Sequence, residues 1–225
     1  MIVKVIKIKN NELILFETEV GSTIWKMNNE KSDLDIASCY LMNSKEMLIG
    51  KKKKGKQIQK GIIDKTLYEL GMVIPQLIKG NVNYIWMITS PIVIFEKYNA
   101  LKELRQIVIE NLSKKTYHSI NGLATHNIHH FIDGGDRESY KYRKKLNVIG
   151  RTLKFGINLL TWKKIMYEKV DIKDDNELIE LKYKLDEALA NSILPEEPNE
   201  KPFHDYLIKY RLKKIKMDGY NRDIL

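Results

Sequence analysis

The hydrophobic period of this chain changes once, at about residue 64, and this change restricts the folds that the chain can adopt. Before it, four segments have the alternation or the apolar content of β-strands: residues 2–8, 12–19, 33–41 and 56–63. After it, apolar residues recur three and four positions apart, as they do along one face of an α-helix. We therefore expect an α+β fold, in which a sheet with flanking helices precedes an all-helical part.

The first predicted helix follows the fourth strand directly. Thr66 and Glu69 fit a capping box at its start, and Lys79-Gly80 fits its end. Its apolar face consists of Leu67, Leu70, Ile74, Leu77 and Ile78. Further helices are predicted at residues 81–88, 97–115, 118–131, 138–165, 174–193 and 203–216. No strand is expected after about residue 97, which places a domain boundary near residue 95.

Composition narrows the class of protein. Hydrophobic residues make up 43% of the 225 residues, which is enough for a proper core. The single cysteine, Cys39, cannot form an internal disulfide, and the first residues lack the continuous apolar core of a signal peptide. No apolar run approaches the roughly 18 residues that span a bilayer. We therefore expect a soluble, cytoplasmic protein with no membrane partner.

The charge balance is basic. Lys and Arg number 39 against 29 Asp and Glu, a formal net charge of +10. Excess positive charge favours polyanionic partners such as nucleic acids and nucleotides. A lysine-rich composition without functional meaning accounts for the same number equally well, so charge alone does not assign a function.

Two carboxylates in the third predicted strand form a candidate metal site. Asp33 and Asp35 are two residues apart, so both project from one face of the strand. Mg²⁺ binds such a place, because it takes one or two carboxylates together with substrate phosphates. Asp64, which closes the next predicted strand, is the expected third acid. Three such acids can hold two metal ions roughly 4 Å apart for phosphoryl or nucleotidyl transfer.

The residues around the acids leave alternatives open. Gly21-Ser22 lies a short loop upstream, where glycine admits a phosphate close to the backbone and the serine hydroxyl can donate to it. Glu69 competes with Asp64 as the third acid, although the predicted capping box gives Glu69 a structural role. Asp-x-Asp also occurs by chance at ordinary turns.

At these residues the chain resembles the DNA polymerase β-type nucleotidyltransferase superfamily. The match is "GST…SDLD…IID". More narrowly, "GSTIWK…SDLDI" followed by "DKTLYELGMVIPQLIKGNVNYIWMITSPIVI" resembles the predicted nucleotidyltransferases associated with RNA repair. The likeness extends into the helical half through "KKLNVIGRTLKFGINLL" and "ILPEEPNE", so it covers most of the chain from about residue 12.

The resemblance implies a nucleotidyltransferase-type mixed sheet as catalytic domain, residues 1–95, and a helical substrate-binding domain, residues 96–225. It implies transfer of NMP from an NTP, ATP among them, to a hydroxyl group, with an RNA 3′ end favoured over a protein or small-molecule hydroxyl. The residues that it assigns are Asp33, Asp35 and Asp64 for two Mg²⁺ ions (Mn²⁺ is an alternative), and Gly21 and Ser22 for phosphate.

Two cations in the helical half complete the predicted site. Lys144 and Arg151 are seven residues apart and share a helical face, which could close over a triphosphate or an RNA end; a solvated basic face is the alternative. The chain departs from the family pattern at Lys26, where glycine is frequent, at Val148, where histidine is frequent, and at Asn158, where an acid is frequent.

The sequence also raises three other interpretations: a binding module, a phosphate-binding loop and a zinc site. A chain with these departures could serve as a non-catalytic nucleotide- or RNA-binding module in a repair or toxin–antitoxin assembly. "GKKKKGK" (50–56) is not a phosphate-binding P-loop, because Gln57 follows in place of Ser or Thr. His126 and His130 have a spacing that can hold zinc, but no further ligands accompany them, and packing at a helix surface is the favoured interpretation.

Overall fold

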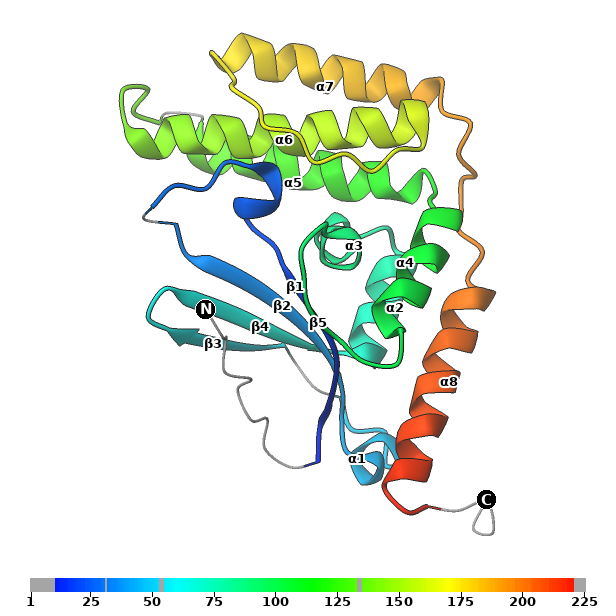
Figure 1. Ribbon diagram of the computed structural model, residues 1–225. Helices are drawn as coiled ribbons and strands as arrows, with labels where there is room; N and C mark the ends of the chain where they lie inside the picture. Colours follow the sequence, from blue (N-terminus) through cyan, green and yellow to red (C-terminus); the bar gives the residue numbers. More distant parts are fainter. Residues whose placement is uncertain (1–10, 31, 53–54, 133–134, 221–225) are drawn as a thin grey trace.

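The computed structural model describes residues 11–30, 32–52, 55–132 and 135–220, and its sheet is mixed, as expected (Figure 1). The strand order is β3-β4-β2-β1-β5. Strands β2 and β4 are parallel, whereas the other three neighbouring pairs are antiparallel. The strands are β1 (Leu13–Glu19), β2 (Leu34–Leu41), β3 (Lys56–Lys60), β4 (Ile63–Glu69) and β5 (Val93–Glu96).

The strands predicted at 12–19 and 33–41 are confirmed as β1 and β2, and the strand predicted at 2–8 lies outside the described residues. The prediction for 56–63 is wrong in part. Strand β3 ends at Lys60, Gly61 turns the chain with a φ of 58°, and the unpredicted strand β4 begins at Ile63. The short strand β5 was not predicted either.

The hydrophobic pattern of the sequence did not predict strand β4, because the buried face of this strand is not apolar throughout. Lys65, Leu67 and Glu69 alternate on the buried face, and two of these three residues are charged. Lys65 is buried because its ammonium group pairs with the carboxylate of Glu17 on β1, and Ser38 of β2 donates to the same carboxylate at 3.0 Å. A buried ion pair of this kind removes the hydrophobic alternation that reveals a strand.

The helices confirm most of the predicted pattern. They are the 3₁₀ turn η1 (Thr23–Trp25), α1 (Ser44–Leu48), α2 (Leu70–Ile78), α3 (Val82–Thr89), α4 (Ala100–Glu110), α5 (Lys115–Phe131), α6 (Tyr140–Trp162), α7 (Asp175–Ala190) and α8 (Lys201–Met217). The predicted capping box is wrong, because Thr66 lies inside β4. Glu69 itself caps α2, and its carboxylate accepts a hydrogen bond from the Gly71 amide at 2.6 Å.

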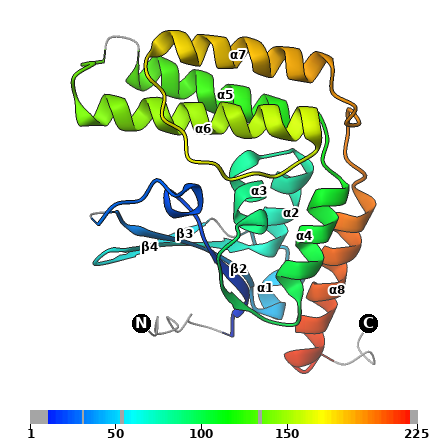
Figure 2. The ribbon, with the colours of Figure 1, turned by 45° about the horizontal axis from the view of Figure 1, so that its top comes forward.

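The helices form two groups around the sheet (Figures 1 and 2). Helices α2, α3 and α4 pack against strands of the sheet, while α6 packs between α5 and α7 in a layer above them. Helix α8 returns to contact α1, α2 and α4, so the end of the chain packs on its first half. Within the described part of the chain, no helix is both long and apolar enough to cross a bilayer.

The hydrophobic core is continuous from the sheet to the helical layer. Trp25, which follows β1, packs edge to face against Trp86 of α3 at 5.4 Å and against Phe155 of α6 at 6.0 Å between ring centroids. Through these ring contacts, α6 packs on η1 and on α3. The division into domains 1–95 and 96–225 remains a prediction.

Candidate active site

Two acids predicted from the sequence are direct neighbours in the sheet. Asp35 of β2 and Asp64 of β4 are partners in the parallel register, and so their side chains project from the same face. Asp33 precedes Asp35 by two residues. Asp64 is the second residue of β4, which corrects the prediction that it closes the preceding strand. Burial raises the pKa of the Asp35 carboxyl, and the charges of Asp64 and Asp33 raise it further.

The Gly-Ser turn is held against Asp35. The amide of Val20 donates to the Asp35 carbonyl oxygen at 2.8 Å. Gly21 follows with a φ of 72°, and a Cβ atom placed on it would lie 1.8 Å from Asp35 Oδ2. Position 21 therefore requires glycine for two reasons: the backbone has a positive φ, and the Asp35 carboxylate occupies the space where a Cβ atom would lie.

A pocket of about 800 Å³ opens beside these residues. Its wall contains Asn29 of the loop after η1 and Tyr140 at the start of α6, and the Asn29 side chain donates to the Tyr140 hydroxyl at 3.3 Å. Asp64 is not among the lining residues. It lies next to Asp35, on the neighbouring strand β4. Six residues predicted from the sequence line the pocket: Gly21, Ser22, Asp33, Asp35, Lys144 and Arg151.

Helix α6 brings two cations to the side of the pocket that faces the acids. Burial lowers the pKa of Arg151 to about 10, and the charge of Asp35 opposes that shift. The guanidinium of Arg151 lies 5.2 Å from the Trp25 ring centroid. Its Nε atom is buried and has no hydrogen-bond partner among the described residues. Lys144 also lowers the pKa of Asp35, so both cations act electrostatically on the acid pair.

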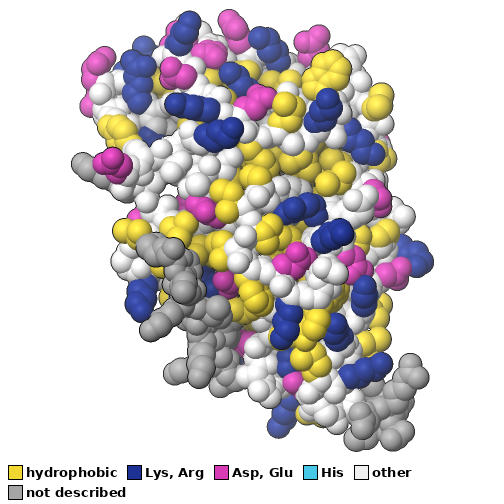
Figure 3. Space-filling view, in the orientation of Figure 1, with side chains coloured by type: hydrophobic (Ala, Val, Ile, Leu, Met, Phe, Trp, Pro, Cys, Tyr) yellow, Lys and Arg dark blue, Asp and Glu magenta, His cyan; other side chains and the backbone are white. Residues whose placement is uncertain are grey.

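Two further cations, Lys141 and Lys145, lie on α6 beside the pocket and pack on Phe131 of α5. Lys145 lies 3.9 Å from the Phe131 ring centroid, and Lys141 lies 5.5 Å from it. Burial lowers the pKa of Lys145, followed by the charges of Lys144, Lys141 and Arg151. On the face drawn in Figure 3, Lys and Arg side chains are spread over the molecule with Asp and Glu between them, and no single basic patch stands out. The net charge therefore does not by itself identify a nucleic-acid surface.

Gln57 is a site residue that the sequence did not reveal. Its Nε2 atom on β3 donates to both carboxylate oxygens of Asp64, at 3.0 and 2.8 Å. Only the antiparallel pairing of β3 with β4 brings these residues together, and no local pattern encodes that pairing. Glu69, the alternative third acid, projects from the opposite face of β4, caps α2 and lies 3.7 Å from Arg211.

The donor set fits a divalent cation through two carboxylates. Asp33 and Asp35 line one pocket. Burial raises the pKa of Asp35 most, and the charges of Asp64 and Asp33 raise it further; a cation between the acids would relieve this repulsion. Mg²⁺ needs no more than one or two carboxylates when substrate phosphates and water supply the other ligands. Across residues 11–30, 32–52, 55–132 and 135–220, no three His, Cys, Asp or Glu side chains are grouped to hold a metal. This includes His126 and His130, whose rings stack at 5.9 Å on α5.

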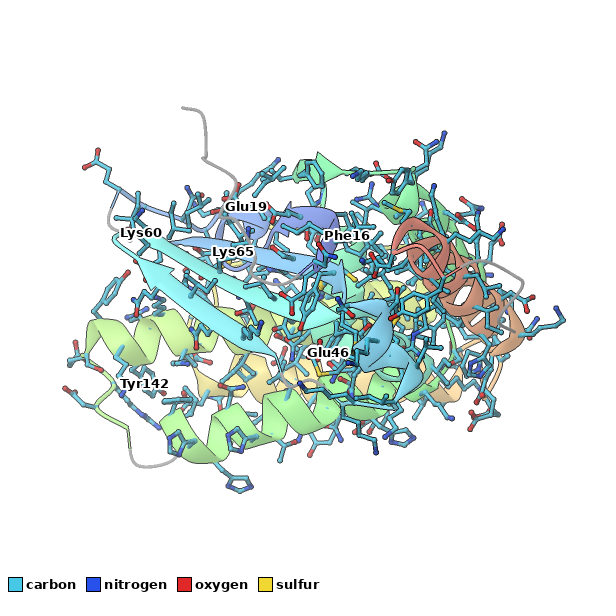
Figure 4. All side chains as sticks on the ribbon, turned by 90° about the horizontal axis from the view of Figure 1, so that it is seen from below. Phe16, Glu19, Glu46, Lys60, Lys65 and Tyr142 are labelled. Carbon is cyan, nitrogen blue, oxygen red and sulfur yellow. The ribbon has the colours of Figure 1, made fainter. Side chains whose placement is uncertain are left out.

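Three further positions clarify the sequence interpretation. Cys39 is completely buried, and burial raises its pKa well above the usual value, as suits a core residue. Tyr142 is also a core residue: it projects from α6 (Figure 4) and donates to Asp175. Lys26, where the family often has glycine, adopts a φ of 56°, the left-handed conformation that glycine takes without strain.

One comparison, with a family model, agrees with the resemblance found in the sequence. A family model described as RNA repair pathway DNA polymerase beta family matches residues 2–192. Among solved structures, the chain is similar to a nucleotidyltransferase-like protein from Exiguobacterium sibiricum 255-15, with 12% identity and a TM-score of 0.32; the alignment covers 92% of this chain and 71% of that one. None of the curated proteins matches it.

Proposed function

This chain belongs to the RNA repair pathway DNA polymerase beta family, and we propose that it is a cytoplasmic, metal-dependent nucleotidyltransferase that transfers NMP from an NTP to an RNA 3′ end. The observation that carries the proposal is the pairing of Asp35 with Asp64 in adjacent parallel strands, directly beside Gly21. Asp35 shares its pocket with Asp33, Lys144 and Arg151, so acidic and cationic groups converge there, and Asp64 lies beside Asp35 on the next strand.

The phosphates of the NTP bind between Gly21-Ser22 and the cations of α6. The lack of a side chain at Gly21 lets a phosphate approach the backbone, and Ser22 offers a hydroxyl donor. Arg151 is well suited to this role because its buried Nε lacks a partner, and a phosphate oxygen can accept a hydrogen bond from it. Lys144 adds a mobile charge at the same wall.

The acids are the residues that would hold divalent cations. Asp33 and Asp35 would bind Mg²⁺ or Mn²⁺, and Asp64 would contribute to a second ion. When bound, the two ions would neutralise the phosphates and lower the pKa of the attacking hydroxyl. A carboxylate has about four acceptor sites, so Asp64 can accept from Gln57 and still ligate an ion. Gln57 is then a positioning residue that holds the Asp64 carboxylate in one orientation.

In the reaction, the acceptor hydroxyl oxygen attacks the α-phosphorus and forms a new phosphoester bond. Asp64 helps to remove the hydroxyl proton as this bond forms. The bond between the α-phosphorus and the α–β bridging oxygen breaks, and pyrophosphate leaves with the bonding electrons. Lys144 and Arg151 stabilise the charge that builds up on the departing phosphates, because both cations lie in the pocket wall.

RNA is the favoured acceptor for two reasons. The family description refers to RNA repair, and Lys141 and Lys145 lie close to Lys144 of the pocket wall on α6, where these lysines could bind a phosphate backbone. Attack by a protein hydroxyl or by a small-molecule hydroxyl uses the same chemistry at the same acids.

A non-catalytic nucleotide- or RNA-binding module is the second candidate, and two observations favour it. Both oxygens of Asp64 are engaged by Gln57, and the described residues contain no three-ligand metal cluster. A module of this kind would retain the pocket and its cations without assembling the metal site.

The experiment that separates the two incubates the protein with labelled NTPs, Mg²⁺ and total RNA. We expect label transfer to RNA by the wild type and none by the variant Asp33→Ala, Asp35→Ala. The variant Asp171→Ala, at an exposed aspartate far along the chain, serves as the control. Transfer that persists in the double variant contradicts the metal-site assignment. Tight RNA binding by the wild type without transfer to any acceptor favours the module.

A further inference from the structure

A second pocket, of about 330 Å³, lies directly behind the first. The two pockets share Gly21 and Arg151 in their walls. The second one opens between the sheet and α3, which runs beneath the α5–α6 layer in both ribbon views (Figures 1 and 2). Its volume falls in the range of about 300–1,000 Å³ that is typical of small-molecule sites. Apart from Gly21 and Arg151, its lining residues take no part in the phosphate contacts proposed above.

The walls of this pocket are aromatic. Trp25 and Trp86 meet edge to face at 5.4 Å, and Tyr68 and Tyr84 lie 5.1 Å apart between ring centroids. Burial raises the pKa of the Tyr68 and Tyr84 hydroxyls, so both phenols are in a partly dry environment. Aromatic walls of this kind bind flat ring systems by stacking, and every nucleobase offers such a face.

The second pocket has few polar groups, and these could form hydrogen bonds with a nucleobase. Asn83 is exposed and offers an amide donor and acceptor. One further lining residue carries a buried donor without a hydrogen-bond partner among the described residues, Trp86 Nε1. Unsatisfied buried donors are rare in folded proteins. Ring nitrogens and carbonyl oxygens of a base are acceptors that could satisfy it.

The pocket continues the face of the sheet that carries the acids. Ala37 follows Asp35 by two residues on β2, and Tyr68 follows Asp64 by four residues on β4, so both lining residues project from the acid-bearing face. A ligand that occupies both pockets therefore crosses the acid pair and passes Gly21 and Arg151. A nucleotide has this shape, with a charged end and a flat aromatic end.

We propose that this pocket, lined by Trp25, Trp86, Tyr68 and Tyr84, is the nucleobase-binding site of the protein. The inference rests on the proposed function, because that function places phosphates in the neighbouring pocket. The base comes from the incoming NTP or from the 3′-terminal nucleotide of the RNA, and both sources offer the same flat ring with acceptor atoms.

Tryptophan fluorescence tests the site without metal or catalysis. Of the three tryptophans, Trp162 is 66% exposed at the end of α6, whereas Trp25 and Trp86 line the pocket. In a Trp162→Phe background, each of the four nucleosides is titrated in the presence of EDTA, with ribose 5-phosphate as a ligand that lacks a base. We expect saturable quenching by at least one nucleoside and none by ribose 5-phosphate.

Substitutions then assign the quenching to the pocket. Trp86→Leu in the same background is expected to weaken nucleoside binding by about 30-fold, the middle of the range for loss of one stacking contact. The matched control is Trp162→Leu in the wild type, which removes the exposed tryptophan and is expected to leave binding unchanged. Tyr84→Leu removes a ring whose contact is with Tyr68 at the pocket wall, and it tests the same site if Trp86→Leu fails to fold. Unchanged affinity in the folded pocket variants overturns the proposal.

Kinetics identify the source of the base. If the NTP supplies it, Trp86→Leu or Tyr84→Leu raises KM for the NTP and leaves KM for an RNA oligonucleotide unchanged. If the RNA end supplies it, the reverse holds. Nucleoside quenching that depends on Trp86 supports the pocket even where no transfer occurs, and the proposed function alone then fails. Transfer by the wild type with no change in either KM in folded variants overturns the pocket alone.

Discussion

Asp35 occupies the space that a side chain at position 21 would need: a Cβ atom on Gly21 would lie 1.8 Å from Asp35 Oδ2. The Gly-Ser turn and the acid pair are therefore one structural unit, in which the phosphate side of the proposed site is built against the metal side. Changes at one part of the unit must disturb the other.

Gly21→Ala should both destabilise the fold and abolish transfer. An L-residue in the left-handed region costs roughly 1–2 kcal/mol, and the clash displaces Asp35 as well. Gly50→Ala is the matched control, because Gly50 has a φ of 70° and no atom within 4 Å of the added Cβ. Thermal unfolding and the transfer assay are measured together. Equal losses in the two variants would show that the clash with Asp35 has no effect.

Asp35→Asn should stabilise the metal-free protein at neutral pH while it abolishes transfer. Burial and the charges of Asp64 and Asp33 raise the pKa of Asp35 in the folded state, so its ionisation costs stability once the pH exceeds that pKa. Asparagine keeps the shape and removes the charge. Unfolding is measured with EDTA and with Mg²⁺.

In that experiment, Mg²⁺ should raise the unfolding temperature of the wild type and leave that of Asp35→Asn nearly unchanged. Asp171→Asn, at an exposed position outside the pocket, should respond to Mg²⁺ like the wild type. A wild type that is more stable than Asp35→Asn in EDTA would contradict the repulsion between the acids.

Gln57→Ala should weaken divalent-cation binding by about tenfold, as is usual when a group that orients a metal ligand is lost. The side chain of Gln57 holds both oxygens of Asp64. Gln59→Ala is the control, because Gln59 lies two residues away on the same face of β3. The dissociation constant for Mn²⁺ is measured by calorimetry. Tighter Mn²⁺ binding by Gln57→Ala would show that Gln57 competes with the metal instead of positioning its ligand.

Asp218→Asn should destabilise the protein by about 1–3 kcal/mol at pH 7, and this difference should vanish in acid. Burial would raise the pKa of the Asp218 carboxyl, but hydrogen bonds from Lys214 and Ser44 outweigh it and hold the pKa below 3.8. The Asp218 carboxylate accepts hydrogen bonds from the Ser44 amide at 3.1 Å and from the Ser44 hydroxyl at 2.7 Å.

Because the folded-state pKa is depressed, the stabilisation by Asp218 is fully present above the unfolded value and is lost as the pH falls through the folded one. Urea unfolding of the wild type and Asp218→Asn at a series of pH values measures this. Asp205→Asn on the same helix breaks the exposed pair with Lys201 and should cost well under about 1 kcal/mol. A pH-independent difference between wild type and Asp218→Asn would contradict the linkage.

Lys26→Gly should stabilise the protein by about 0.5–1 kcal/mol. Lys26 has a φ of 56°, where glycine avoids the strain of an L-residue but loses more backbone entropy on folding. Lys163 follows α6 and has a φ of 53°, so Lys163→Gly should stabilise the protein by a similar amount and serves as an independent check. Thermal unfolding gives both values, and destabilisation by both substitutions would show that the entropy loss is the larger effect.

The sequence by itself determined the local parts of this protein. Period-two alternation puts Asp33 and Asp35 on one face of a strand, and helical spacing puts Lys144 and Arg151 on one face of α6, because both patterns follow from backbone geometry within one element. The turn at Gly21-Ser22 and most helices could likewise be read from the residues themselves.

Only the tertiary structure decided how these parts meet. The parallel pairing of β2 with β4 sets Asp64 beside Asp35, and the pairing of β3 with β4 brings Gln57 to Asp64. Strand β4 itself stayed hidden, because its buried Lys65 is neutralised by a partner on another strand. Pairing register and helix docking depend on contacts between residues far apart in the chain. No short stretch of sequence carries that information, and so the pairings within the predicted site are decided only when β4 and α6 pack against β2.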